Sequence, residues 1–321
     1  MNCFGVEIFG SLGGSEEGSG DWAMFNDTDG RRPSREQIAE AAYHRWERRG
    51  GDHGGDRDDW AAVEKDLVFA LNYRYIARYK LSGRGPVYVG RPESERSQRP
   101  RRCRFCEQAE PSATFRKTPP VLPPIAGNSA LFAWDECDEC HGLFEAHLAG
   151  PFEAFARPLL RDQPRIPSGI PVAVLKVLVR AGISVLPVGE LHHFGDTSEW
   201  VSNPDHDLDA ALLHGLGCYL YLTPEPVPSA SIAVSRRVDE DSRTPYAIVF
   251  LALAPSRIVL QAVLPLCTRD EDLEDGTMRG PELSMSLGQG RNHRASESRF
   301  LPVIPPDTVR IPMRGEAGLR A

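Results

Sequence analysis

Two short stretches decide the fold of this chain: RRCRFCEQ at residues 101–108 and WDECDECHG at residues 134–142. Each stretch carries two cysteines separated by two residues, Cys103 and Cys106 in the first and Cys137 and Cys140 in the second. Structural zinc sites use four soft ligands in a tetrahedron, and two such pairs on separate segments supply them. We therefore predict a structural Zn²⁺ centre that joins the two stretches.

Other interpretations of these cysteines are open. C-x-x-C-H is the pattern that attaches a c-type haem, and a single C-x-x-C is typical of a redox dithiol. Haem attachment leaves Cys103 and Cys106 unexplained, and neither pair lies in a thioredoxin-like strand–helix context. Four free buried cysteines fit poorly because the surrounding residues are polar. Arg101, Arg102 and Arg104 flank the first pair and favour the ionised thiolates that bind a metal.

The composition limits the class of protein. The 321 residues carry a formal net charge of -8, which argues against a protein that coats nucleic acid non-specifically. The sequence lacks the run of about 18 apolar residues that spans a membrane, so we expect no membrane partner. Its first residues, MNCFGVEIFGSLGG, lack the basic start of a signal peptide. We therefore expect a cytoplasmic protein without structural disulfides.

The apolar pattern predicts an α+β fold. Residues 33–51 predict a helix in which Ser34 and Gln37 stand at the two positions of a capping box. Residues 57–79 predict a second helix that completes a helical hairpin. Further on, apolar segments between turn residues predict an antiparallel sheet. The strands of this sheet are expected at 218–222, 231–238, 246–254 and 257–266. Two helices are expected before it, at 172–186 and 188–201, and two separate short strands at 3–8 and 87–89.

These elements predict six segments along the chain. They are a disordered N-terminus at 1–33, the helical hairpin at 34–80, a linker at 81–100, a zinc-binding module at 101–160, an α+β C-terminal domain with helix and antiparallel sheet at 161–268, and a flexible tail at 269–321.

The run between the two cysteine pairs resembles a known family. Thr114-Phe115-Arg116-Lys117, Gly127-Asn128 and Cys137-Asp138-Glu139-Cys140 match landmarks of bacterial HNH-endonuclease-like proteins, and the likeness extends over residues 101–201. The resemblance implies a zinc-stapled, treble-clef ββα module and a nuclease with a divalent metal. Separately, residues 38–67 resemble the bacterial DUF2934 family, which implies no activity.

The chain departs from the HNH pattern at its catalytic strand. The family's histidine, which takes a proton from the attacking water, aligns with Pro120, and a following glutamate aligns with Pro124. Proline cannot accept that proton. Asn128 remains at a position that orients a base, and His141 stands where many HNH motifs place a metal-binding histidine. The resemblance thus leaves Asn128 and His141 as candidate catalytic residues, with Mg²⁺ or Mn²⁺ required only if activity survives.

Basic residues around the first pair suggest contact with DNA or RNA. Phe105 and Phe115 interleave with them, as in a surface that binds phosphates and bases. The acidic residues of the second stretch argue against such contact. The candidate nucleic-acid-binding residues are Arg101, Arg102, Arg104, Arg116 and Lys117.

Three functions follow from the sequence. The first is a nucleic-acid-directed HNH-like protein with weakened or lost phosphodiesterase activity. The second is a zinc-stapled interaction or regulatory module with a protein partner bound through the C-terminal domain. The third is an active metal-dependent nuclease with a relocated base.

Overall fold

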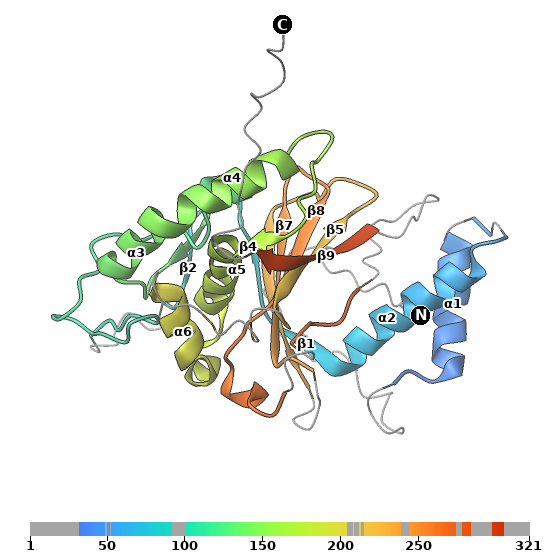
Figure 1. Cartoon of the computed structure of the whole chain (residues 1–321), viewed down its shortest axis with the longest axis horizontal. Helices are drawn as coiled ribbons and strands as arrows, with labels where there is room; N and C mark the ends of the chain where they lie inside the picture. The colour runs from blue at the N-terminus through green and yellow to red at the C-terminus, as the bar shows by residue number, and fades with distance from the viewer. Residues whose placement is uncertain are drawn as a thin grey trace, which may run out of the picture.

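A computed structural model of the chain describes residues 32–304, except for 49, 52, 92–99, 204–207, 209–211, 213–214, 239–243, 274–277 and 284–296. The strand predicted at 3–8 lies outside the described residues. The protein is a mixed α+β structure built on a large, mainly antiparallel sheet, as the sequence predicts (Figure 1). No helix among the described residues is long and apolar enough to cross a membrane.

The central sheet has seven strands, and all neighbours are antiparallel except the last pair, which is parallel. In spatial order the strands are β1 (Tyr73–Lys80), β6 (Ser231–Arg237), β7 (Ala247–Leu253), β8 (Ile258–Val263), β5 (Gly217–Leu222), β9 (Glu297–Ile304) and β4 (Ile170–Pro171). Every residue of β7 and β8 is buried, which matches the continuous apolar sequence of β7 and the largely apolar sequence of β8, and indicates a sheet covered on both faces.

One face of the sheet is covered by α5 (Val172–Val185), in which every residue from Val174 onward is buried. Gly182 allows this close packing, because a Cβ atom there would lie 2.7 Å from Leu264 Cδ2 and 3.3 Å from Val249 Cβ. The other face packs against Phe69, near the end of α2 (Asp56–Asn72), whose ring meets that of Phe250 edge-on. The two faces thus form two apolar clusters, one on each side of the sheet.

The predicted helical hairpin is present at α1 (Arg35–Arg48) and α2. Its capping box is confirmed, since the Gln37 side chain accepts a bond from the Ser34 N–H at 2.7 Å and the Gln37 N–H donates to the Ser34 hydroxyl at 3.2 Å. A buried ion pair between Arg45 and Asp59, at 3.1 Å, joins the two helices. Figure 1 shows the hairpin extending from the sheet on the side opposite α3 (Asp138–Phe144) and α4 (Gly150–Leu159).

The cysteine segments belong to a region that packs on the outer side of α5. It contains a small parallel sheet of β2 (Val87–Val89) and β3 (Leu131–Ala133), followed by α3 (Asp138–Phe144), a π-helical turn (Glu145–Ala149) and α4 (Gly150–Leu159). The strand predicted at 87–89 is confirmed as β2. After α5 come a 3-10 helix (Val188–His193) and α6 (Gly195–Ser202), where one helix was predicted at 188–201.

Two predictions were wrong about secondary structure. The second helix was expected to continue to residue 79, but it ends at Asn72 and the chain enters β1. Tyrosines and arginines suit a half-buried strand, and pairing with β6 buries Tyr73 and Ala77. The tail after residue 269 was expected to be flexible, but it contributes β9.

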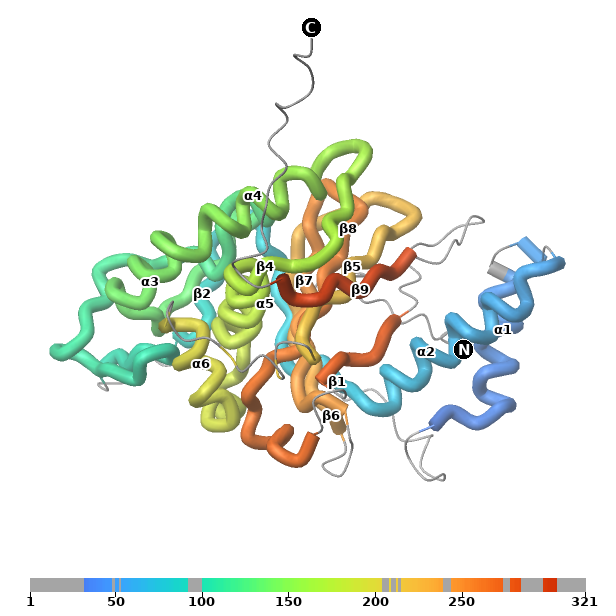
Figure 2. Tube along the Cα trace, in the orientation of Figure 1, coloured from blue at the N-terminus to red at the C-terminus, as the bar shows by residue number. Residues whose placement is uncertain are grey.

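The position of β9 explains why residues 297–304 form a strand. Figure 2 shows β9 beside β5 and β4, far from it in sequence. Antiparallel pairing with β5 buries Leu301 completely, and Gly217 leaves room for the Phe300 ring. The seven-stranded sheet therefore takes strands from three of the six predicted segments, 34–80, 161–268 and 269–321. The division of the chain into domains stays a prediction.

Candidate metal centre

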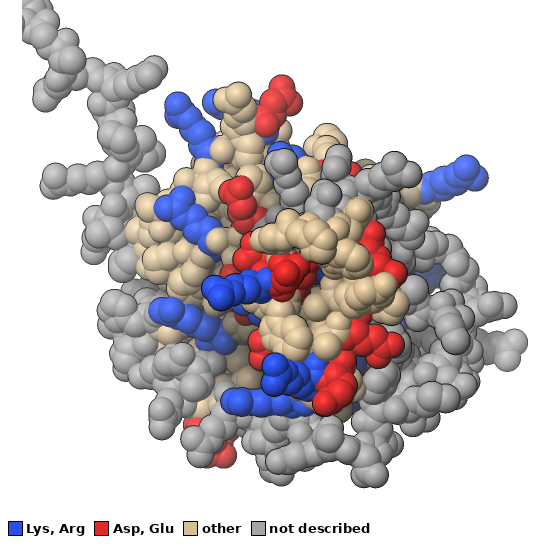
Figure 3. Space-filling model, turned by 90° about the vertical axis from the view of Figure 1, so that its right-hand side faces the viewer, with Lys and Arg blue, Asp and Glu red and all other residues tan. Residues whose placement is uncertain are grey.

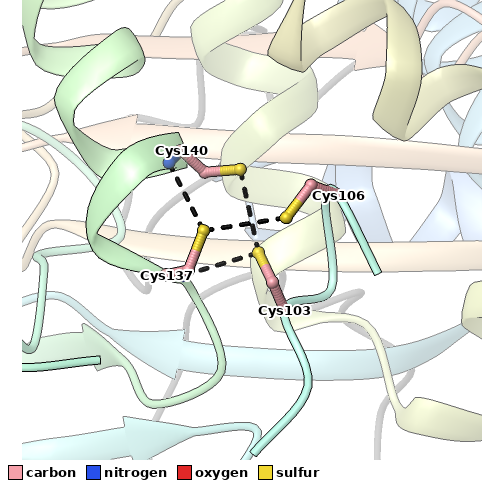
Figure 4. Close-up of side chains that lie close together, drawn as sticks. All are labelled: Cys103, Cys106, Cys137 and Cys140. Atoms are coloured by element: carbon pink, nitrogen blue, oxygen red, sulfur yellow. Dashed lines mark hydrogen bonds between the residues drawn. The ribbon is translucent and has the colours of Figure 1, made fainter. Parts of the chain in front are cut away.

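The four cysteines of the two predicted pairs lie together (Figure 4). Cys137 precedes α3 as its N-cap and Cys140 lies in the first turn, while Cys103 and Cys106 come from a tight turn bridged by Arg102 and Ala109. The sulfurs of Cys103 and Cys140 are 3.8 Å apart, those of Cys106 and Cys137 are 3.7 Å apart, and all four lie within 4.8 Å of one another.

This spacing fits a metal ion. Four sulfurs placed at about 2.3 Å from a tetrahedral zinc ion are about 3.8 Å from each other. Three of the four cysteines are buried, and Cys106 is partly exposed. The cluster could therefore bind a metal ion, and the identity of that metal as zinc stays a prediction.

The thiols of the cluster differ in acidity. The adjacent Cys140 sulfur and nearby backbone N–H groups lower the pKa of Cys103 to about 5. Burial raises the pKa of Cys137 to about 12, and the Cys103 sulfur raises the pKa of Cys140. Neighbouring thiolates repel each other in a buried site, so a bound cation is required for all four to ionise. With four thiolates as ligands, every tetrahedral position is filled, as in structural zinc sites.

Arg104 holds the first cysteine pair against α5. Its side chain is 1% exposed and makes two hydrogen bonds to the Asp135 carboxylate, at 2.7 and 2.6 Å. Its other amino group donates to the carbonyls of Ile183 and Ser184, both at 2.6 Å, and to that of Leu186 at 3.4 Å. These carbonyls lie at the C-terminal end of α5, where helical partners run out. Arg104 is therefore not at a surface where a nucleic acid would meet it.

The other predicted nucleic-acid-binding residues divide into two groups. Arg101 is partly buried and donates to the carbonyls of Phe115 at 3.0 Å and Trp134 at 2.6 Å. Phe105 and Phe115 were expected to interleave with the basic residues at the surface, but both rings are buried in the core beneath them. The exposed members of the predicted set are Arg102, Arg116 and Lys117.

A fully buried carboxylate stands directly before the second cysteine pair. Glu136 accepts two hydrogen bonds of 2.6 Å from Arg180, which lies in the middle of α5. Arg180 also donates to the carbonyls of Val121 at 2.9 Å and Pro120 at 3.4 Å. Its guanidinium lies 4.5 Å from the centre of the Phe144 ring. This pair connects α5, the segment around Pro120 and the start of α3.

Asp138 also connects two segments of this region, but nearer to the surface. Its carboxylate accepts hydrogen bonds from the N–H of Lys117 at 2.9 Å, the Thr114 hydroxyl at 2.7 Å and the N–H of Arg116 at 3.1 Å. These bonds, the one from Lys117 first, lower the pKa of Asp138 to about 2. The Thr114–Lys117 segment is thereby fixed against the first turn of α3.

The candidate catalytic residues lie in different surroundings. Asn128 is buried, its amide group donates to the carbonyls of Leu122 and Leu131, and its oxygen accepts from the Leu131 N–H. His141 lies in the first turn of α3, partly exposed, with Nδ1 3.5 Å from Glu136 and Nε2 3.7 Å from Glu145. Asn128 thus holds a turn, while His141 faces carboxylates, and a catalytic role for either stays a prediction.

Arg180 is a buried partner that none of the sequence motifs points to. It stands in VAVLKVLVRAGISV, a helix that is otherwise largely apolar, and a cation in such a helix signals a buried partner. Its partner, Glu136, is one of the acidic residues of the second stretch that were expected to argue against contact with nucleic acid, but it is fully buried.

Comparison with known proteins identifies one segment. Residues 33–67 match the family described as "Protein of unknown function (DUF2934)", a span that covers α1 and most of α2. No curated protein and no solved structure matches the chain significantly.

Proposed function

We propose that this chain is a zinc-stapled, HNH-like protein that binds nucleic acid without hydrolysing it. The proposal rests on the residues at the positions where the HNH pattern has its catalytic base and the residue that orients the base, Pro120 and Asn128. Pro120 offers only its carbonyl, which is directed to Arg180, and the Asn128 amide is occupied by three backbone bonds. Neither residue can take a proton from water, which hydrolysis requires.

The cysteine cluster supports the structural part of the proposal. A catalytic zinc keeps one coordination position open for water or substrate, whereas four cysteines close the site, so a zinc ion bound here would be structural. Zinc bound here would supply folding free energy and would fix the two cysteine segments relative to each other.

Binding is supported by the distribution of charge near the cluster. Asp135 and Glu136 are neutralised internally by Arg104 and Arg180, so these acidic residues do not oppose a polyanion at the surface. Arg102, Arg116 and Lys117 remain exposed, with Arg116 84% exposed. Figure 3 shows Asp and Glu side chains interspersed with Lys and Arg on the face that carries α1 and α2. Glu107, Glu110 and Glu139 are exposed near the cysteine cluster, so nucleic-acid binding by this region depends on Arg102, Arg116 and Lys117.

The test combines three measurements on one sample: metal content, nuclease activity and nucleic-acid affinity. Plasmid, linear duplex and single strands are incubated with Mg²⁺, with Mn²⁺ and with neither. We expect one zinc per chain, binding that weakens with salt, and no cleavage. Metal-dependent cleavage that His141→Ala abolishes would overturn the proposal in favour of an active nuclease with a relocated base.

A protein-interaction module is the second candidate, and the helical hairpin favours it. Tyr43 on α1 is 54% exposed, and its ring contacts that of Trp46 on the same helix. A zinc-loaded protein that binds no nucleic acid at low salt would support this candidate instead.

A further inference from the structure

The small parallel sheet of β2 and β3 has an unusual outer face. Val89, Leu131 and Ala133 point inward and are buried, with exposures of 4%, 0% and 0%. Because side chains alternate along a strand, the paired residues Tyr88 and Phe132 point the opposite way. The outer face of a sheet is usually polar, yet here it carries aromatic rings that are only partly buried.

Three rings and two guanidinium groups form this surface, which we call the aromatic face: Tyr88, Phe132, Trp134, Arg91 and Arg101. The Tyr88 ring centre lies 6.0 Å from that of Phe132 and 6.1 Å from that of Trp134. Arg91 lies 5.1 Å from the Trp134 ring centre and 5.8 Å from that of Tyr88, and Arg101 lies 3.9 Å from that of Trp134. Aromatic π-faces and cations therefore alternate across one exposed face.

We propose that the aromatic face binds single-stranded nucleic acid, with bases stacked on Tyr88 and Phe132 and phosphates paired with Arg91. This inference rests on the proposed function and specifies the ligand and the residues. Base–aromatic stacking tolerates any sequence, since every base has a π-face, and guanidinium groups add cation–π and phosphate contacts. A duplex keeps its bases stacked inside, where these rings cannot reach them.

Charge favours a nucleic acid over an apolar protein partner at this face. The cations Arg91 and Arg101 lie over the rings, and Arg102 is exposed beside Arg101. Of the nearby carboxylates, Asp135 is paired with Arg104, and exposed Glu110 accepts a hydrogen bond from the Arg101 N–H at 3.1 Å. The guanidinium groups lie on the rings themselves, and together with the flat apolar surface they match a flexible polyanion with unstacked bases.

The experiment measures fluorescence anisotropy of labelled 20-residue oligo(dT), oligo(U) and a 20-base-pair duplex, at low and moderate salt. We expect Tyr88→Ala and Phe132→Ala each to weaken single-strand binding about 5- to 100-fold, as loss of one stacked base does. Tyr88→Phe keeps the ring and should stay within about twofold of the wild type. Tyr43→Ala, which removes an exposed aromatic ring from α1, is the matched control and should change nothing.

The two proposals fail in different ways. Wild-type protein that binds none of the three probes overturns the proposed function and this inference together. Single-strand binding that survives Tyr88→Ala and Phe132→Ala, but is lost with Arg102→Ala/Arg116→Ala/Lys117→Ala, overturns the aromatic face alone. Zinc content and melting temperature are measured for every variant, so that unfolding is distinguished from loss of a contact.

Discussion

Two arginines on either side of Cys103, Arg102 and Arg104, should behave very differently when each is replaced by methionine. Arg104 is buried and bonded to Asp135 and to the last carbonyls of α5, whereas Arg102 is exposed. Methionine keeps the length of the side chain and removes its charge and hydrogen bonds. We predict that Arg104→Met destabilises the fold severely and that Arg102→Met has little effect on the free energy of unfolding.

The magnitude follows from the contacts of Arg104. Opposite charges about 4 Å apart attract by roughly 4 kcal/mol at the effective dielectric constant of a protein. Removing one partner of a buried pair typically costs about 3–5 kcal/mol, because the remaining charge stays buried without compensation. The carbonyls of Ile183 and Ser184 also lose the Arg104 donor, although that of Ile183 keeps the Leu186 N–H at 3.3 Å. We therefore expect a loss of about 3–5 kcal/mol for Arg104→Met and within about 0.5 kcal/mol of zero for Arg102→Met.

Urea unfolding followed by circular dichroism measures this difference. With an m-value of about 3 kcal/mol per molar urea, a loss of 3–5 kcal/mol moves the midpoint down by at least about 1 M. Arg104→Lys keeps the charge but not the fork of donors, and should recover only part of the loss. Equal midpoints for Arg102→Met and Arg104→Met would refute the assigned role. Stable Arg104→Met protein with impaired nucleic-acid binding would restore Arg104 to the binding surface.

Three further predictions concern the metal, the pH and a buried amide. Cys140→Ser should lower zinc content measured by plasma mass spectrometry and reduce the melting temperature, whereas Cys267→Ser, at a buried cysteine outside the cluster, should leave zinc content unchanged. Asp270 has its pKa raised from 3.8 to about 6, chiefly by burial, so the folded state binds its proton more tightly than the unfolded state does. The free energy of unfolding should therefore decrease, by up to about 3 kcal/mol from this group, as pH rises from about 3 to about 7. In denaturant titrations at several pH values Asp270→Asn should remove that slope, and a slope identical to the wild type would contradict the assignment. Asn128→Ala removes the donor of the Leu122 carbonyl and the acceptor of the Leu131 N–H, while the Leu131 carbonyl keeps the Val121 N–H at 3.1 Å. It should lower the free energy of unfolding by about 2–4 kcal/mol, measured by urea titration, and a change below about 0.5 kcal/mol would show that the amide is dispensable for the turn.

The sequence by itself determined those features in which the local pattern and the final environment agree. The capping box at Ser34 and Gln37 needs only residues three apart, so it forms wherever the helix forms. The two C-x-x-C pairs are likewise local, and a shared ligand set implies that they meet. Continuous apolar runs such as AIVFLAL predicted the buried strands of an antiparallel sheet, because only a strand covered on both faces is apolar throughout.

Tertiary structure decided the features that depend on distant partners. Residues 73–80 pair with β6 and leave the helical pattern, and residues 297–304 join the sheet because β5 offers them an edge. The burial of charged residues differed most from what the sequence indicated. Arg104 and Glu136 look exposed in a polar stretch, but α5 covers them and supplies Arg180 and the helix-end carbonyls. A buried charge is stable only with such a partner, and a partner some 44 to 82 residues away in the chain is visible only in the folded protein.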